Sequence, residues 1–143
     1  MRFSVKTEYG LRVLIELATL ENGVSIPARQ IAARQHIPQR FLEQQVTALR
    51  KAGLVNSRRG AGGGCALARP ADRITVAEAI EALEGPIIDV PGDRDSATET
   101  RVVRELWARA GADLKRMLST TSVADLVARK KQLDESRSPM FYI

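Results

Sequence analysis

The sequence predicts a mainly α-helical protein in which three short helices precede a two-stranded β-hairpin and a long C-terminal helix. Three observations support this fold class. Apolar residues recur at helical spacing in three segments within residues 7–52. A glycine-rich turn with two adjacent arginines then separates two short apolar runs, which is typical of a hairpin. After residue 98, apolar residues alternate steps of four and three, the spacing of a helix with one apolar seam.

Each of the three short helices has a stripe of apolar residues and a stop. The first is expected over 7–20, where apolar positions repeat every three or four residues. The second is expected from Ser25, a suitable N-cap, to Gln35, and the run His36-Ile37-Pro38 breaks it. The third is expected over 39–52 and ends at a glycine.

The hairpin has an unusual tip. Strands are expected over 54–57 and 65–68, and the tip over 58–64 contains Arg58-Arg59 followed by four glycines. Three short helices followed by a two-stranded hairpin is the order of a winged helix-turn-helix, with the hairpin as the β-wing.

The second half of the chain is expected to be helical again. Thr75 is expected to cap a helix that runs to about Leu83, and Glu78 completes the pattern of a capping box. The long amphipathic helix follows, and Thr121 or Ser122 is expected to cap a last short helix.

Four regions follow from these elements. The winged helix-turn-helix is expected over 1–84, a loop with two prolines over 85–97, and the long helix with the short terminal helix over 98–130. A polar, flexible tail is expected over 131–143.

Composition excludes several classes of protein. The net charge of +5 is unevenly spread: +6 in residues 1–60, −5 in 61–100 and +4 in 101–143, and grouped basic charge favours a polyanionic partner. One cysteine and one histidine leave no disulfide framework, no multi-cysteine zinc site and no catalytic triad. No apolar run approaches the roughly 18 residues of a membrane span. We therefore expect a cytoplasmic protein that is not an enzyme and has no membrane partner.

The third helix has a second face suited to DNA. Opposite its apolar stripe, Arg40, Glu43, Gln44 and Thr47 follow the spacing i, i+3, i+4 and i+7, and Gln39 stands at its start. These side chain types pair with base edges in the major groove, so we expect them to read bases in double-stranded DNA. The alternative is an ordinary solvated helix face.

Basic residues and glycines near this helix are expected to contact the DNA backbone or the minor groove. An arginine beside a thin glycine tip favours the narrow, negative minor groove. The alternative for the tip is a flexible, solvated turn. The residues expected in these contacts are Arg2, Lys6, Arg50, Lys51, Arg58, Arg59, Gly60, Gly62 and Gly63.

Several short motifs occur together in one known family. They are Tyr9-Gly10-Leu11-Arg12, Ile31-Ala32-Ala33-Arg34-Gln35, Phe41-Leu42-Glu43-Gln44, Leu49-Arg50-Lys51-Ala52-Gly53-Leu54-Val55, Arg59-Gly60-Ala61-Gly62-Gly63-Gly64, Leu67-Ala68-Arg69-Pro70, Ile74-Thr75-Val76 and Ala82-Leu83-Glu84-Gly85-Pro86. On these residues the sequence resembles the Rrf2 family of bacterial transcription regulators over about residues 2–86, and more loosely around Trp107 and 122–126.

The resemblance implies a homodimeric, sequence-specific DNA-binding regulator, expected to act as a repressor at a palindromic operator. In the family, the positions of Arg40, Glu43 and Gln44 read bases, and the position of Arg59 enters the minor groove. The subunits pair through the long helix, with Trp107 as an anchor or, alternatively, as part of an effector pocket. The expected interface residues are Val103, Leu106, Trp107, Ala110, Leu114 and Met117.

The sequence also departs from the family. Many members hold an iron–sulfur cluster through three loop cysteines, whose positions fall near Asp89, Asp95 and Arg101 here. We therefore expect no cluster and no metal, and a place in the cluster-free branch of the family. His36 stands where the family usually has glycine, so a positive φ is expected there. Cys65 is interpreted as a small apolar strand residue, with a redox switch favoured by Arg58 and Arg59 as the alternative.

A second class of function stays open. The chain could be a protein-interaction module of winged-helix fold that regulates through a bound partner rather than through DNA. The intact polar face of the third helix and the wing arginines argue against it. The small-molecule or protein effector is not specified by the sequence.

Overall fold

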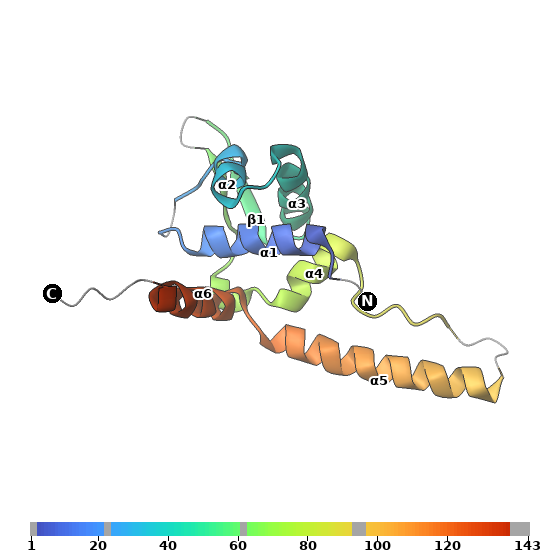
Figure 1. Ribbon diagram of the computed structural model, residues 1–143. Coiled ribbons are helices and arrows are strands. Elements are labelled where there is room, and N and C mark those ends of the chain that lie inside the picture. Colours follow the sequence, from blue (N-terminus) through green and yellow to red (C-terminus); the bar gives the residue numbers. More distant parts are fainter. Residues whose placement is uncertain (1–2, 22–23, 61–62, 93–96, 138–143) are drawn as a thin grey trace.

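The structure, a computed structural model, describes residues 3–21, 24–60, 63–92 and 97–137. It is mainly helical, with a body of short elements from which one long helix extends (Figure 1). The elements in chain order are α1 (Val5–Ala18), α2 (Ala28–Gln35), α3 (Gln39–Lys51), β1 (Val55–Arg58), β2 (Gly64–Leu67), the 3₁₀ turn η1 (Ala71–Arg73), α4 (Val76–Glu84), α5 (Thr98–Thr120) and α6 (Val123–Arg137).

The helix α1 lies across the base of α2 and α3 and forms the centre of the body (Figure 1). Its apolar stripe packs with those of α2 and α3 into one aliphatic core, in which Leu14, Ile31, Leu42 and Leu49 are completely buried. Each such side chain contributes about 1.5–3 kcal/mol when it leaves water. This core fixes the orientation of the outer face of α3.

The hairpin confirms the predicted β-wing. β1 and β2 pair antiparallel, with Val55 opposite Leu67 and Ser57 opposite Cys65. A third segment joins them, because Ile26 and Cys65 exchange two backbone hydrogen bonds with N–O distances of 3.0 and 2.7 Å. The wing is therefore attached to the chain just before α2.

This attachment corrects the predicted start of the second helix. Ser25 does not cap it; α2 begins at Ala28, after Pro27. The residue before a proline is restricted to extended conformations, and Ile26 uses that conformation to pair with β2.

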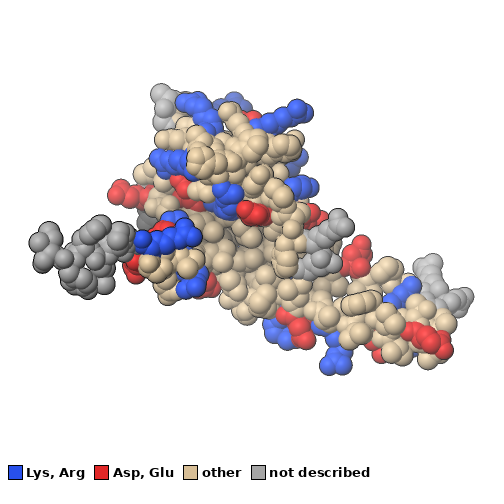
Figure 2. All heavy atoms as spheres, in the orientation of Figure 1, with Lys and Arg blue, Asp and Glu red and all other residues tan. Residues whose placement is uncertain are grey.

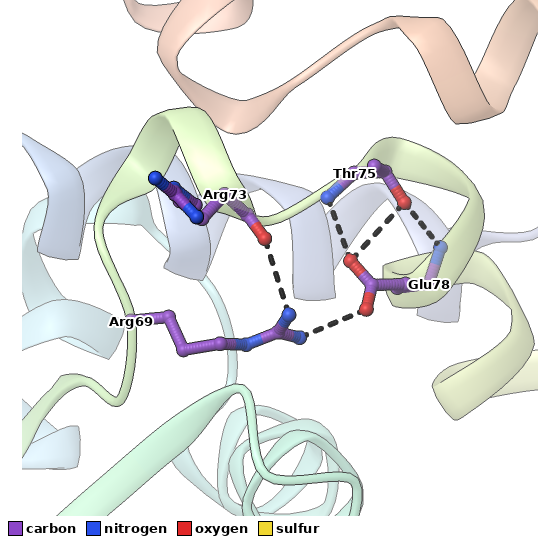
Figure 3. A network of polar contacts seen from close by, with 4 residues as sticks. All are labelled: Arg69, Arg73, Thr75 and Glu78. Carbon is purple, nitrogen blue, oxygen red and sulfur yellow. Dashed lines mark hydrogen bonds and ion pairs between the residues drawn. The ribbon is translucent and has the colours of Figure 1, made fainter.

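Polar contacts hold the start of α4 (Figure 3). Thr75 and Glu78 form the predicted capping box: the Thr75 hydroxyl accepts from the Glu78 amide at 3.1 Å, and the Thr75 amide donates to Glu78 Oε2 at 3.0 Å. Arg69 joins them through Glu78 Oε1 at 2.9 Å and also donates to the Arg73 carbonyl at 3.1 Å. The backbone hydrogen bond from Thr75 and the Arg69 contact together hold the Glu78 pKa below its usual value.

Helix α5 packs on α4 through its C-terminal half. Leu118 contacts Val76 and Ile80 of α4, and Lys115 forms an ion pair with Glu81 at 3.0 Å. The N-terminal half extends away from the body as an arm (Figure 1).

The end of the chain is more ordered than predicted. A flexible tail was expected from residue 131, but α6 continues to Arg137, and only 138–143 lie outside the described residues. Ser122 caps α6, because its hydroxyl accepts from the Asp125 amide at 3.1 Å. The ion pair between Lys130 and Asp134, one helical turn apart, supports the last turns.

Candidate DNA interface

The outer face of α3 carries the side chains predicted to read bases. Arg40, Glu43 and Gln44 are exposed on the side opposite the buried Leu42 and its neighbours. Gln39 is also exposed, and its Nε2 donates to Glu43 Oε1 at 2.9 Å. The helix thus has one face fixed in the core and a polar face free to enter a groove about 12 Å wide.

Thr47 differs from the other predicted readers. It is half-buried, and its hydroxyl donates to the Glu43 carbonyl at 2.8 Å. The hydroxyl proton is therefore used within the helix, which leaves the oxygen lone pairs and the methyl group for any contact with DNA.

The turn between α2 and α3 depends on His36. This residue has φ +53° and ψ +42°, the left-handed conformation predicted for it, and is the only non-glycine residue with positive φ in the described part of the chain. Arg12 of α1 holds the end of α2, since its guanidinium donates to Oε1 of Gln35 at 3.2 Å and to the Gln35 carbonyl. These contacts fix the angle at which α3 leaves the turn.

The wing places its basic side chains next to the end of α3. Arg58 and Arg59 are exposed. Arg50, near the end of α3, donates from Nη1 to Ser57 Oγ on β1 at 3.2 Å. This contact, which sequence reasoning did not anticipate, ties the wing to the helix, and it gives Arg50 a partner inside the protein besides its predicted contact with phosphate.

Two of the wing glycines have an internal role. A Cβ on Gly63 would collide with the carbonyls of Arg58 and Gly60, the latter at 2.8 Å. A Cβ on Gly64 would collide with the backbone of Ile26. The fold of the hairpin therefore requires these two glycines, whereas Gly60 has open space around it. The predicted contacts Arg2 and Gly62 lie outside the described residues.

Basic side chains gather at this end of the molecule. Lys and Arg atoms cluster where α2, α3 and the wing lie, and most of the acidic atoms visible in this view lie farther away (Figure 2). Lys51 at the end of α3 and Lys6 in the first turn of α1 are also exposed. A phosphate backbone would meet positive charge on both sides of α3.

Cys65 lies inside the wing rather than on its surface. Its side chain is buried in the core, and burial raises the pKa of the thiol, with a smaller opposing influence from Arg50. The redox alternative assigned the opposite shift to Arg58 and Arg59. A buried thiol with a raised pKa is a poor nucleophile, which favours the apolar interpretation.

The predicted dimer contacts lie on the face of α5 that the body leaves open. Leu106 is 57% exposed and Trp107 60% exposed, and Val103 and Met117 are also exposed. Ala110 lies on the same open side.

One residue of the predicted interface, Leu114, packs inside the chain instead. It is half-buried against the apolar cluster that α4 forms with Leu118. Val102, which the prediction omitted, is exposed and lies one turn from Leu106, a spacing that could have revealed it. Trp107 lines none of the five main cavities of the described residues. None of the described helices is long and apolar enough to span a bilayer.

Comparison with known proteins gives one consistent result. The profile of the Rrf2 family, described as an iron-dependent transcriptional regulator, matches residues 3–129. The HTH-type transcriptional regulator CymR of Bacillus subtilis is 39% identical over the full length of both chains. The regulator IscR of Cereibacter sphaeroides is 31% identical over 89% of this chain and 87% of its own.

A solved structure agrees with the sequence comparisons. The structure of CymR, the global cysteine regulator of B. subtilis, superimposes with a TM-score of 0.78 at 38% identity, over 90% of this chain and 98% of the other. Its winged-helix fold is the one described above. The chain therefore belongs to the Rrf2 family and is a DNA-binding transcription regulator of the helix-turn-helix type.

Proposed function

We propose that the chain is a homodimeric repressor that reads a palindromic operator, with α3 in the major groove and the wing in the minor groove of each half-site. The observation that carries this proposal is the geometry around α3. Arg40, Glu43 and Gln44 share its exposed face, and the bond from Arg50 to Ser57 keeps the wing arginines beside its end. Base readout and minor-groove contact are then available from one rigid unit.

The dimer is supported by the apolar face of α5. Val103 and Met117 lie seven residues on either side of Ala110. In an antiparallel pair with its two-fold axis at Ala110, each Val103 would face the Met117 of the other copy, so one patch is complementary to itself. A two-fold dimer places equivalent helices at half-sites about one helical turn of DNA, roughly 34 Å, apart.

We further propose that this member of the family works without a thiolate-bound cluster and without catalysis. The family description is iron-dependent, but the donor set here does not fit such a group. The single cysteine is buried in β2, and the described residues contain no cluster of three or more His, Cys, Asp or Glu side chains placed to hold a metal ion. Purified protein should be colourless and free of stoichiometric iron; a visible absorption band with bound iron would overturn this part.

Operator selection tests the readout. DNA sequences that bind are selected from a random pool with the wild type, Glu43→Ala and Arg59→Ala. Arg116→Ala serves as the control, because it also removes one exposed arginine but lies on α5, where Arg116 pairs with Asp113. Glu43→Ala should relax the preferred sequence at one position of each half-site by about 1–3 kcal/mol. Arg59→Ala should keep the preference outside the minor-groove contact but bind more weakly, with a salt slope smaller by about one.

Two results would contradict the proposal. Identical selected sequences for wild type and Glu43→Ala would show that this face of α3 does not read bases. Absence of any DNA binding, at low salt and with the protein folded, would favour the protein-interaction module instead.

A further inference from the structure

An open hollow lies between the wing and the segment of the chain that leads into α2. Its volume is about 480 Å³. Gly60, Gly63 and Gly64 line it on the wing side, so backbone without side chains forms that part of the wall. The hollow lies at the end of the molecule where α2, α3 and the wing meet and where basic atoms cluster (Figure 2). It therefore borders the surface proposed to contact DNA.

The charged side chains in the wall of the hollow are both arginines. Arg29 lines it from α2, Arg58 lines it from β1, and both are exposed. None of the lining residues is acidic. Two positive charges that share a partly enclosed space favour an anion between them, and the fork of N–H groups on a guanidinium matches the oxygens of a phosphate group.

Arg29 has no contact inside the protein that would account for its charge. Its guanidinium forms no ion pair or hydrogen bond with any residue that the structure describes, and α2 contains no acidic residue. Arg34 of the same helix differs, because it pairs with Glu16 of α1 at 3.0 Å. The charge of Arg34 is therefore used within the fold, whereas that of Arg29 is available to a ligand.

Ser57 adds a hydrogen-bond donor to the same wall. Its side chain lines the hollow, and its Oγ accepts from Arg50 Nη1 at 3.2 Å. Because the oxygen is the acceptor in this contact, the hydroxyl proton is available to an anion in the hollow. The wall thus offers two guanidiniums and one hydroxyl group, all of them donors.

The proposed place of the wing identifies the source of the anion. A wing in the minor groove has one sugar–phosphate strand on each side of it, and the hollow lies on the side of the wing that faces α2. The minor groove is only about 6 Å wide, so the phosphates at its edges pass close to the wing.

We propose that the hollow holds one phosphate of the DNA strand that borders the minor groove, between Arg29 and Arg58. This rests on the proposed function and adds a contact to it, because the sequence prediction did not include Arg29. It also assigns Arg58 to the backbone at the edge of the minor groove, while Arg59 enters the groove.

Neutralisation of single phosphates tests the site. The probe is a duplex with the operator selected by the wild type, in which one phosphate at a time is replaced by an uncharged methylphosphonate. At one position beside the minor groove, the replacement should weaken binding of the wild type about tenfold. The double variant Arg29→Gln/Arg58→Gln should bind the unmodified duplex more weakly and should lose little further affinity at that position, because the contact is already absent.

The dependence of binding on salt counts the contacts independently. The double variant should lower the slope of log K against log salt by about one, because both arginines act on one phosphate. Arg29→Lys keeps the charge and should keep the wild-type slope. Arg116→Gln is the control, because it removes an exposed arginine of α5 that pairs with Asp113, and it should bind like the wild type. The selected base sequence should be the same for all of these proteins, since phosphate contacts carry no sequence information.

Three results would overturn the proposal. One is equal sensitivity of the wild type and the double variant to every methylphosphonate. Another is unchanged operator affinity in Arg29→Gln. The third is a melting temperature that inorganic phosphate raises for the wild type but not for the double variant, while both bind the operator equally, which would make the hollow a site for free phosphate. Failure of the wild type to select any operator would instead remove the proposed function, and this site with it.

Discussion

Replacement of Gly64 by alanine should break the attachment of the wing. Gly64 begins β2 with φ +150°, and an added Cβ would lie 2.7 Å from Pro27 N and even closer to the Ile26 backbone. These atoms are backbone and cannot rotate away, so the strand itself must move. The next residue, Cys65, exchanges two backbone hydrogen bonds with Ile26, and a shift of the strand would break both.

The size of the effect follows from these contacts. Backbone strain at a positive φ costs about 1–3 kcal/mol for a residue with a side chain. Loss of two backbone hydrogen bonds adds about 0.5–1.5 kcal/mol each. We therefore expect Gly64→Ala to lower the free energy of unfolding by about 2–6 kcal/mol. Gly60→Ala is the matched control: Gly60 has φ +103° but nothing within 4 Å of an added Cβ, so only the strain applies.

Urea unfolding followed by far-ultraviolet circular dichroism, at one fixed protein concentration, measures the difference. Trp107 fluorescence is unsuited as a probe, because this side chain lies on the exposed arm of α5. Gly64→Ala should be about 2 kcal/mol less stable than Gly60→Ala. Equal stabilities would refute the argument that close approach to Ile26, rather than φ alone, requires glycine at position 64.

Three further predictions concern α4, α5 and the thiol. Glu78→Gln should remove part of the acid sensitivity of folding. Because Thr75 and Arg69 lower the Glu78 pKa, the wild type loses the stabilisation from these contacts as the pH falls below about 4.3. The free energy of unfolding, measured with urea between about pH 5 and 3, should therefore fall less steeply for the variant than for the wild type. An equally steep curve would contradict this. Leu106→Asp should convert the proposed dimer to a folded monomer, measured by sedimentation velocity. An unchanged sedimentation coefficient would remove α5 from the proposed interface. Cys65 should react with a thiol reagent far more slowly in the native than in the urea-unfolded protein, because it is buried and its pKa is raised; equal rates would restore the redox alternative.

Local sequence signals predicted the elements whose structure depends on neighbours in the chain. The helix α4 is an example, because Thr75 and Glu78, three residues apart, satisfy each other at its start. The same kind of signal placed Arg40 and Glu43 on one exposed face of α3. The positive φ of His36, which the structure shows, was predicted from the resemblance instead, because the family usually has glycine at this position.

Contacts between residues far apart in the chain explain where the structure differs from the sequence predictions. Ser25 has the chemistry of an N-cap, but pairing of Ile26 with Cys65, 39 residues later in the chain, keeps the backbone extended and delays α2. Leu114 has the spacing of the apolar seam of α5, but α4 lies against that side of the helix and partly covers it. No pattern within the segment of either residue reveals the distant partner.

Two of the wing glycines are required by the fold of the hairpin itself. In the sequence, a glycine-rich tip favours minor-groove insertion because it is thin. The structure gives Gly63 and Gly64 a different reason, since both are needed where backbone segments meet inside the protein. These two glycines would therefore be required in a wing that never touched DNA. The evidence for contact with DNA comes from the wing arginines instead. Arg58 and Arg59 support minor-groove contact more directly, because both are exposed and follow Ser57, which Arg50 joins to the end of α3, the helix proposed to read bases.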